Sequence, residues 1–175
     1  MSDITVRALG EADWEEYRSV RLAALRESPE AFVASLEEEQ AYDESAWRDR
    51  MNRSQRLLAV RQGEAVGVVS IGEGEGNTGE VGELFGLWVA PDYRGSGVAT
   101  LLVKEAASRA RTSGRRHLVY WVGTENGRAV AFASGMGFLP TDYRRPMGVV
   151  SADDGDEEIA MVLPLHEEPG PQPRL

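Results

Sequence analysis

Cysteine is absent from the 175-residue sequence, and histidine occurs only as His117 and His166. Without cysteine, the chain has no disulfide, no thiolate nucleophile and no cysteine-ligated metal. Two histidines so far apart in the sequence do not make a histidine-rich metal centre either. We therefore predict that the protein uses no metal and that both histidines are structural or solvated.

A long apolar run is missing as well. No segment approaches the roughly 18 apolar residues that a helix needs to cross a bilayer. The first residues, Met1 to Ile4, have neither the basic start nor the apolar stretch of a signal peptide. These features predict a cytoplasmic protein that does not associate with membranes.

Basic residues are outnumbered, because 19 Lys and Arg face 29 Asp and Glu, for a net charge of −10. Nucleic-acid binding needs a basic face, so the charge argues against a nucleic-acid partner. An acidic chain suits a cationic partner such as an amine, although excess charge also serves solubility. The hydrophobic content of 42% and charged content of 27% are ordinary for a soluble globular protein.

The apolar periodicity predicts a mixed α/β single domain over residues 1–165. Helical spacing predicts helices over residues 11–26, 32–51, 97–112 and 126–136, the second broken near Tyr42-Asp43. Apolar runs bounded by turn residues predict strands over residues 4–7, 57–60, 65–71, 84–89, 117–122 and 159–163, with another beginning at Gly137. We expect residues 141–158 to form a solvated, mobile loop, and residues 166–175 to form a disordered, Pro-rich tail.

Two glycine patterns could hold a phosphate, and their contexts separate them. The stretch Gly74 to Gly79 matches G-x-G-x-x-G, which binds dinucleotides only between a strand and a helix N-terminus. Here a strand follows instead, and neighbouring glutamates would repel phosphate. A flexible hairpin loop is therefore the favoured interpretation, and a dinucleotide oxidoreductase is the weaker alternative.

The second pattern, Arg94-Gly95-Ser96-Gly97-Val98-Ala99, lies between a buried strand and an amphipathic helix. The N–H groups of residues 95–100 are then expected to point outward at the positive end of the helix dipole. The glycines let the backbone approach an anion closely, and Arg94 can add positive charge beside it. The pattern predicts a diphosphate site, although a plain glycine turn that caps a helix has the same letters.

Residues 81–138 resemble the core of the GNAT superfamily of N-acetyltransferases. The family's Arg/Gln-x-x-Gly-x-Gly/Ala turn is matched at residues 94–99, and its Asn-x-x-Ala motif with a closing Gly-Phe is matched at Asn126 to Ala129 and Gly137-Phe138. The first half is similar to a common bacterial branch, through Val6-Arg7, Asp13-Trp14, Arg21 to Leu25, Pro29 to Phe32 and Trp47. The likeness covers nearly all of residues 4–165.

The resemblance implies a GNAT-like fold: a mostly antiparallel sheet of about six to seven strands, flanked by helices, with a V-shaped split between two central strands. It implies that acetyl-CoA binds in that split as co-substrate. The cofactor-binding residues would be Leu87, Trp88, Val89, Arg94, Gly95, Ser96, Gly97, Val98, Ala99, Thr100 and Asn126. The Asn126 amide would hold the cofactor arm, and the same side chain can also cap the following helix.

Acetyl transfer to an amine needs a neutral amine, a polarised carbonyl and a proton for the departing thiolate. A lysine-type ammonium has a pKa near 10.4, so a base must remove its proton before attack. Glu83 lies four residues before Leu87, where a lysine-modifying branch of the family carries its base. We predict Glu83 as the catalytic base in an apolar setting; a solvated carboxylate or a water relay is the alternative.

The general acid is where this sequence departs from the family. Many members carry a tyrosine at the position of Ala133, and alanine cannot donate a proton. Ser134, Tyr120, Tyr143 or a bound water could protonate the thiolate instead. The sequence therefore predicts an acetyl-CoA:amine N-acetyltransferase, with a non-catalytic acyl-CoA-binding module as the alternative. The acceptor is expected to be a small-molecule or peptide amine that carries positive charge, and a homodimer is plausible from the family's habit.

Overall fold

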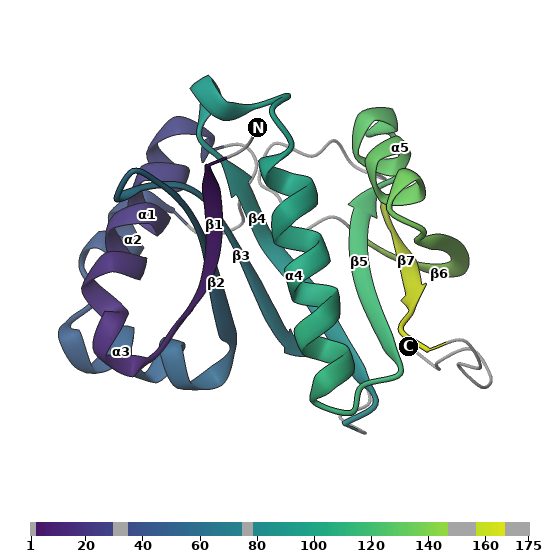
Figure 1. The fold of residues 1–175 in the computed structure, drawn as a ribbon, viewed down its shortest axis with the longest axis horizontal. Coiled ribbons are helices and arrows are strands. Elements are labelled where there is room, and N and C mark those ends of the chain that lie inside the picture. Colours follow the sequence, from purple (N-terminus) through teal and green to yellow (C-terminus); the bar gives the residue numbers. More distant parts are fainter. Residues whose placement is uncertain (1–2, 30–34, 75–78, 147–156, 167–175) are drawn as a thin grey trace. The chain divides into compact units, whose positions relative to one another are not determined.

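The computed structural model describes residues 3–29, 35–74, 79–146 and 157–166 (Figure 1). The strands are β1 (Ile4–Leu9), β2 (Gln55–Arg61), β3 (Glu64–Glu73), β4 (Val81–Val89), β5 (His117–Gly123), β6 (Leu139–Pro146) and β7 (Glu157–Pro164). The helices are α1 (Trp14–Glu27), α2 (Leu36–Gln40), α3 (Glu44–Arg53), α4 (Val98–Thr112) and α5 (Gly127–Gly135), with short 3₁₀ turns η1 (Glu11–Asp13) and η3 (Pro91–Tyr93).

The seven strands form one sheet in the order β1-β2-β3-β4-β5-β7-β6. Antiparallel pairs join β1 to β2, β2 to β3, β5 to β7 and β7 to β6, and the β4–β5 pair is parallel. The predicted mixed α/β fold with a mostly antiparallel sheet flanked by helices is confirmed. Parallel pairing of β4 with β5 covers Val81 to Leu84 and His117 to Tyr120. The V-shaped split, expected beyond these residues, stays a prediction.

The chain divides into two compact units, and β4 and α4 contribute to both. Unit 1 comprises residues 1–71 and 86–106, and unit 2 comprises residues 72–85 and 107–175.

In unit 1, helix α1 packs against both α2 and α3 (Figure 1). The fully buried Trp47 of α3 meets the Tyr17 ring edge-on at a centroid distance of 6.1 Å. Glu39 of α2 is 1% exposed, and its carboxylate pairs with Arg21 at 3.0 Å and with Arg50 at 2.7 Å. Because a buried charge is costly unless it is paired, these two arginines fix α2 against its neighbours.

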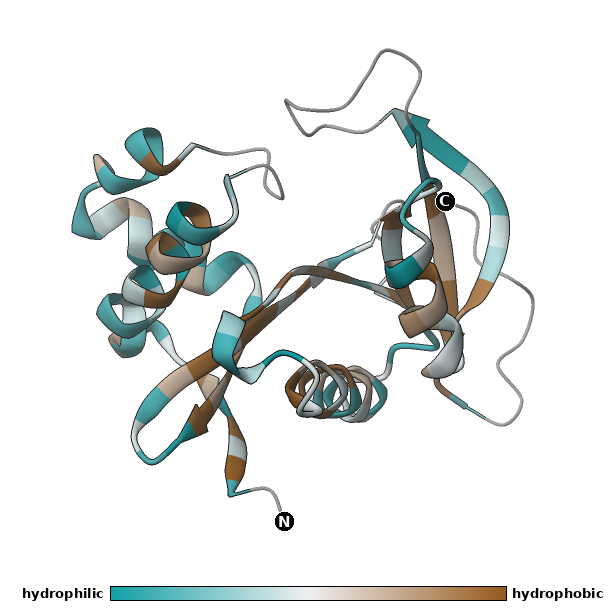
Figure 2. Cartoon of the chain, turned by 90° about the horizontal axis from the view of Figure 1, so that it is seen from above, coloured by the Kyte–Doolittle hydropathy of each residue, from teal (hydrophilic) through white to brown (hydrophobic). Residues whose placement is uncertain are grey.

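Helix α4 begins tightly against β3 in unit 1. A Cβ atom at Gly67 of β3 would lie 2.9 Å from Val98 Cγ1 and 3.1 Å from the Trp88 carbonyl oxygen. Only glycine leaves room for this approach, so Gly67 helps to place the start of α4. Figure 2 shows apolar residues gathered on one side of α4, in agreement with the burial of Val98, Leu102, Val103, Ala106, Ala107 and Ala110.

In unit 2, strand β5 lies between β4 and β7. Its core includes Val81, Val119, Ala160 and Val162, with Trp121 and Tyr143 packed against them. Helix α5 contacts β5 and ends in a glycine turn, since Gly137 has a φ of +101°. Left-handed glycine is a common way to end a helix, and the turn leads directly into β6.

The prediction of a loop over residues 141–158 is wrong for its first part. Residues 141–146 belong to β6, an edge strand that pairs with β7 around a register shift between Pro140 and Arg144. The Thr141 hydroxyl donates to the Ala160 carbonyl oxygen at 2.8 Å across that irregularity. An edge strand buries little, so β6 shows no continuous apolar run. Residues 157–158, also predicted as loop, begin β7. Residues 147–156 and 167–175, which carry the rest of the loop and tail predictions, lie outside the described residues.

Candidate active site

Strand β4 delivers the predicted catalytic and cofactor residues with an alternating burial pattern. Gly82, Leu84 and Trp88 are buried, whereas Glu83, Leu87 and Val89 are partly accessible. Gly86 interrupts the strand with a φ of +64°, a conformation that glycine adopts at little cost. The strand continues through Gly86 to Val89, and Leu87, Trp88 and Val89 again alternate between partly accessible and buried.

After β4 the chain enters the glycine turn of unit 1. The N–H of Ala90 donates to the Val66 carbonyl oxygen at 2.9 Å, which ties the strand end to β3. Gly95 and Gly97 then have φ values of +81° and +90°. Both lie in the left-handed region, which is costly for residues with a Cβ. These two glycines are what allows the turn to fold back into α4.

The N–H groups of this turn form the expected row of donors, with one exception. The first main-chain bond of α4 runs from the Leu101 N–H to the Gly97 carbonyl oxygen at 3.0 Å, and the Ser96 N–H donates to Tyr93 at 3.4 Å. Within the described residues, no main-chain acceptor is recorded for the N–H groups of residues 95, 97, 98, 99 and 100. Residues 94–97 are exposed, so an anion can approach the N–H groups of Gly95 and Gly97, whereas Val98 is buried and residues 99 and 100 are partly exposed.

The Arg94 side chain makes contacts that the sequence did not predict. Its Nη2 donates to Glu27 Oε2 at 2.8 Å, and its Nε donates to the Val89 carbonyl oxygen at 2.9 Å. Glu27 Oε2 also accepts from the Trp88 indole Nε1 at 3.0 Å and from the neighbouring Ser28 hydroxyl. The last residue of α1 thus collects donors from both the end of β4 and the glycine turn.

These contacts stabilise the ionised form of Glu27. Hydrogen bonds from the Ser28 hydroxyl, the Trp88 indole and the Arg94 guanidinium lower the pKa of Glu27 from 4.5 to about 2. The carboxylate therefore stays charged at every pH at which an acetyl transfer to an amine would run.

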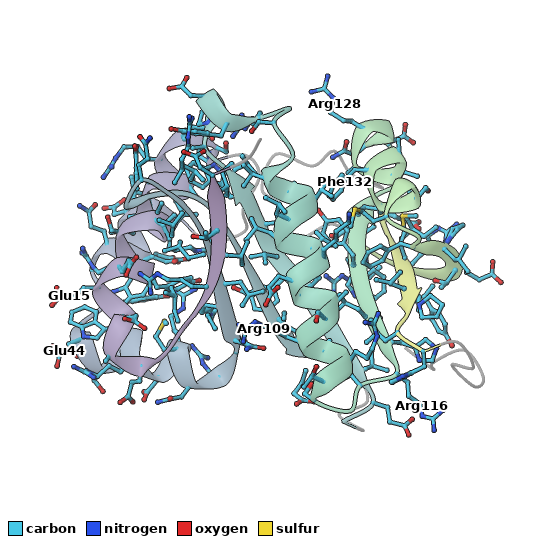
Figure 3. All side chains as sticks on the ribbon, in the orientation of Figure 1. Glu15, Glu44, Arg109, Arg116, Arg128 and Phe132 are labelled. Atoms are coloured by element: carbon cyan, nitrogen blue, oxygen red, sulfur yellow. The ribbon has the colours of Figure 1, made fainter. Side chains whose placement is uncertain are left out.

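Asn126 caps α5 in unit 2. Its Oδ1 accepts from the Ala129 N–H at 3.1 Å, which is the capping role that the sequence allowed. Among the described residues the amide nitrogen of Asn126 has no protein partner, and the residue is exposed. Figure 3 shows the Arg128 side chain extending outward from the first turn of the same helix.

Glu83 lies beside an arginine rather than in a purely apolar setting. Its Oε1 is 3.6 Å from Arg145 Nη2, and the side chain is 23% exposed. Arg145 Nε is also 3.3 Å from Glu158 Oε1, and the guanidinium lies 4.2 Å from the centre of the Trp121 ring. The predicted base is thus one member of a cluster in unit 2 that comprises Glu83, Arg145, Glu158 and Trp121.

Sequence reasoning missed Arg145, Glu158 and Trp121 as functional candidates. They were assigned to the loop over residues 141–158 or treated as sheet residues, and their neighbourhood depends on the β6–β7 register, which pairs Arg145 with Glu158. The alternation of Tyr143 and Arg145 with exposed neighbours is the one local signal that could have indicated a strand here.

Comparison with known proteins identifies the family. The model of the acetyltransferase (GNAT) family matches residues 12–138, which is more than half of the chain. The chain belongs to the GNAT family.

An uncharacterized N-acetyltransferase of Methanocaldococcus jannaschii is 42% identical over 59 residues, which are 34% of this chain and 26% of that protein. One of Archaeoglobus fulgidus is 34% identical over 93 residues, 51% of this chain and 60% of that protein. The chain thus spans less than two thirds of either relative. Among solved structures, yncA of Salmonella typhimurium, described as an acetyltransferase with its cofactor acetyl-CoA, has a TM-score of 0.73 at 20% identity. That alignment covers 98% of this chain and 99% of the other, and it shows the shared fold.

The glycine pattern at Gly74 to Gly79 is not a dinucleotide site by its surroundings. It connects β3 to β4, and the Gly74 N–H donates to the Val81 carbonyl oxygen at 3.0 Å. Residues 75–78 lie outside the described residues. A strand-to-strand connection lacks the helix N-terminus that holds a diphosphate in the dinucleotide fingerprint.

At Ala133, where many GNAT proteins carry tyrosine, the side chain is fully buried. Of the alternative proton donors that the sequence named, Tyr120 lies on β5 and is partly buried. Burial, helped by the charge of Glu158, raises the pKa of Tyr120, so the phenol keeps its proton at neutral pH. Its ring meets Phe138 edge-on at 6.2 Å.

Neither histidine joins these residues. His117 is 5% exposed on β5, and burial, with Arg116 nearby, lowers its pKa. His166 Nε2 lies 3.2 Å from the Arg115 carbonyl oxygen. In the described part of the chain, no three His, Cys, Asp or Glu side chains are grouped as metal ligands, and no helix there is long and apolar enough to cross a membrane.

Proposed function

We propose that this GNAT protein is an N-acetyltransferase that moves the acetyl group of acetyl-CoA to a primary amine by direct attack. The observation that carries the proposal is the turn before α4. Within the described residues five of its N–H groups have no main-chain acceptor, and Gly95 and Gly97 shape it with positive φ values. A diphosphate carries the charge that such a helix start stabilises.

The proposal assigns the binding of acetyl-CoA to the residues that the sequence predicted. The backbone of Leu87, Trp88 and Val89 would pair with the pantetheine arm, residues 94–100 would hold the diphosphate, and the Asn126 amide would contact the arm. The Arg94 contact does not disqualify Val89, because a carbonyl oxygen accepts two hydrogen bonds. The amide nitrogen of Asn126 is available because its oxygen serves the helix cap.

The reaction follows from what each group can do. The amine nitrogen attacks the thioester carbonyl carbon, a C–N bond forms, and the C–S bond then breaks to release the CoA thiolate. Glu83 would take the proton from the amine, and Tyr120 would return one to the sulfur, with Ser134, Tyr143 or water as alternatives. A positioned acid or base typically contributes 10² to 10⁴ in rate.

The Glu83 cluster supports a cationic acceptor. Glu83 and Glu158 already hold one guanidinium, with the Trp121 face beside it. Carboxylates and an indole face are groups that also stabilise an ammonium. We therefore keep the expectation of a positively charged small-molecule or peptide amine. Such an amine would have to displace Arg145 from Glu83 and Glu158 or share these carboxylates with it.

A thiol-release assay tests the proposal directly. The full chain is incubated with acetyl-CoA and a mixed library of amines, and free CoA thiol is followed over time. Turnover above the amine-free rate supports the proposal. Titration calorimetry with acetyl-CoA tests the binding half, and folded protein that gives no heat at millimolar acetyl-CoA would overturn it.

The buried Ala133 favours one second candidate, a non-catalytic acyl-CoA-binding module. A chain without the usual tyrosine could hold the thioester without releasing it. This alternative predicts acetyl-CoA binding with no thiol release across the whole library. Release with any amine above the uncatalysed background rejects it.

A further inference from the structure

One carboxylate in unit 1 connects the two segments that the proposed function assigns to the binding of acetyl-CoA. Glu27 Oε2 is 3.0 Å from the Trp88 indole nitrogen and 2.8 Å from Arg94 Nη2. These donors lie 61 and 67 residues further along the chain. Trp88 belongs to the strand that would pair with pantetheine, and Arg94 opens the turn that would hold the diphosphate.

Arg94 extends the connection to the backbone. Its Nε donates to the Val89 carbonyl oxygen at 2.9 Å, so one guanidinium joins the end of β4 to the end of α1. Two of its donors are therefore directed at fixed protein acceptors. A side chain held in this way sets the path of residues 89–94 and cannot move toward a phosphate without giving up both contacts.

We propose that Glu27 is a positioning residue for acetyl-CoA, which acts by holding Trp88 and Arg94, and that Arg94 shapes the donor site instead of contacting the diphosphate. The inference rests on the proposed function. It assigns the recognition of the diphosphate to the main-chain N–H groups of the turn. It also makes the end of α1 a determinant of acetyl-CoA binding.

An ordinary surface ion pair does not account for this arrangement. The Glu27 side chain keeps 31% of its exposure, but its partner Trp88 is buried at 8% exposed. A buried indole N–H needs an acceptor, and Glu27 supplies it. Loss of the carboxylate would therefore release both the indole and the guanidinium. The end of β4 and the turn at Arg94 would then no longer be held by a common acceptor.

The test compares two acetyl donors in the full chain. Acetyl-CoA carries the diphosphate, and acetyl-pantetheine lacks it. Glu27→Gln keeps the shape of the side chain and removes its charge, and Arg94→Lys keeps a positive charge but removes the second donor. Glu15→Gln is the matched control, because Glu15 is an exposed glutamate on the same helix, pointing outward in Figure 3.

We expect Glu27→Gln and Arg94→Lys to raise the KM for both donors about tenfold, with kcat within about twofold of wild type. The KM of the double variant should rise no more than that of the more affected single variant, because both substitutions break the same connection. Glu15→Gln should leave both constants unchanged. Thermal unfolding of each variant confirms that the compared proteins are folded.

Two results would overturn the inference. If Arg94→Lys affects acetyl-CoA but not acetyl-pantetheine, the side chain contacts the diphosphate. If Glu27→Gln behaves like Glu15→Gln, the carboxylate positions nothing. In both cases wild-type turnover stands, so the proposed function survives. Wild-type protein that binds neither donor removes the proposed function and this inference with it.

Discussion

The two units each contain a cluster in which glutamate meets arginine, and the clusters are built in opposite ways. In unit 1, one carboxylate, Glu27, accepts from several donors at 2.8 to 3.0 Å. In unit 2, one guanidinium, Arg145, is shared between Glu83 at 3.6 Å and Glu158 at 3.3 Å. The first places its donors at hydrogen-bond distance around a fixed acceptor. The second holds a cation loosely between two acids.

The difference in contact length indicates different structural roles for the two clusters. Short contacts from Glu27 reach a buried indole and, through Arg94, a main-chain carbonyl, so they define the shape of the backbone. The contacts of Arg145 with Glu83 and Glu158 are longer, and its guanidinium also lies against the face of Trp121. A cation held in that way can exchange with another cation. Under the proposed function, the first cluster would keep the acetyl-CoA site in one shape, and the second would accept a cationic amine beside Glu83 and Glu158.

The largest effect is expected from Glu83→Gln. If Glu83 takes the amine proton, the substitution should lower kcat at neutral pH by about 10² or more. The loss should shrink at pH 9, where more of the amine is already neutral. Rates of thiol release at both pH values measure this. Glu80→Gln is the control, because Glu80 is an exposed acid three residues earlier. An equal loss at both pH values would exclude the base role.

Gly97→Ala tests whether the turn beside the Glu27 cluster binds the donor. The φ of +90° at Gly97 strains alanine, so we expect about 1–2 kcal/mol of lost stability and at least tenfold weaker acetyl-CoA binding. Gly63→Ala is a matched control: its φ is +78°, and both sites have open space for a Cβ. The control should lose similar stability and no affinity. Equal affinity loss in both variants would contradict the assignment.

Arg145→Ala tests whether the second cluster holds an exchangeable cation. Removal of the guanidinium leaves Glu83 and Glu158 to an incoming ammonium, so the KM for a diamine should fall several-fold, within the range of an exposed ion pair. Steady-state kinetics with a diamine and a neutral-tailed monoamine measure it. Arg144→Ala, at the exposed neighbouring position, should change neither constant. A higher KM for the diamine would mean that Arg145 is part of the acceptor site itself.

The two clusters also differ in how far the sequence could predict them. The turn at residues 94–100 was predicted because its glycines, preceding strand and following helix lie within a short stretch of chain. Glu27 was missed, because its donors come from positions 61 and 67 residues away and no local pattern links them. The same holds for Glu83 and Arg145, whose meeting depends on the register of an edge strand. Local turn chemistry can be derived from neighbours, but side-chain pairing between distant elements requires the fold.

The helices and strands were predicted well where apolar periodicity is strong. Strand β5 and helix α4 lie within one or two residues of their predicted bounds. The break near Tyr42-Asp43 is also present, since α2 ends at Gln40 and α3 begins at Glu44. A strand beginning at Gly137 was predicted, but the part of β6 from residue 141 on was assigned to a loop, because its exposed positions are polar and only one neighbouring strand pairs with it. The predicted apolar setting of Glu83 failed for the same reason, since β6 carries the arginine beside it.

The smallest expected effect concerns the pH dependence of stability. Glu27 has a folded-state pKa of about 2 against an ordinary value of 4.5, so its contacts stabilise the folded chain fully above about pH 4.5. That contribution is lost progressively as the pH falls toward 2, because protonation then costs the folded state its hydrogen-bonded carboxylate. The Tm of wild type should therefore exceed that of Glu27→Gln at pH 6, and the gap should narrow between pH 5 and pH 3.

Glu15→Gln again supplies the comparison, and its Tm gap from wild type should stay small and constant over the same range. Thermal unfolding followed by circular dichroism at each pH gives these values. A gap for Glu27→Gln that stays constant with pH would mean that the carboxylate is not held by its three donors in solution. Glu27 would then not hold Trp88 and Arg94 together, and the contrast between a fixed carboxylate in unit 1 and a shared guanidinium in unit 2 would no longer apply.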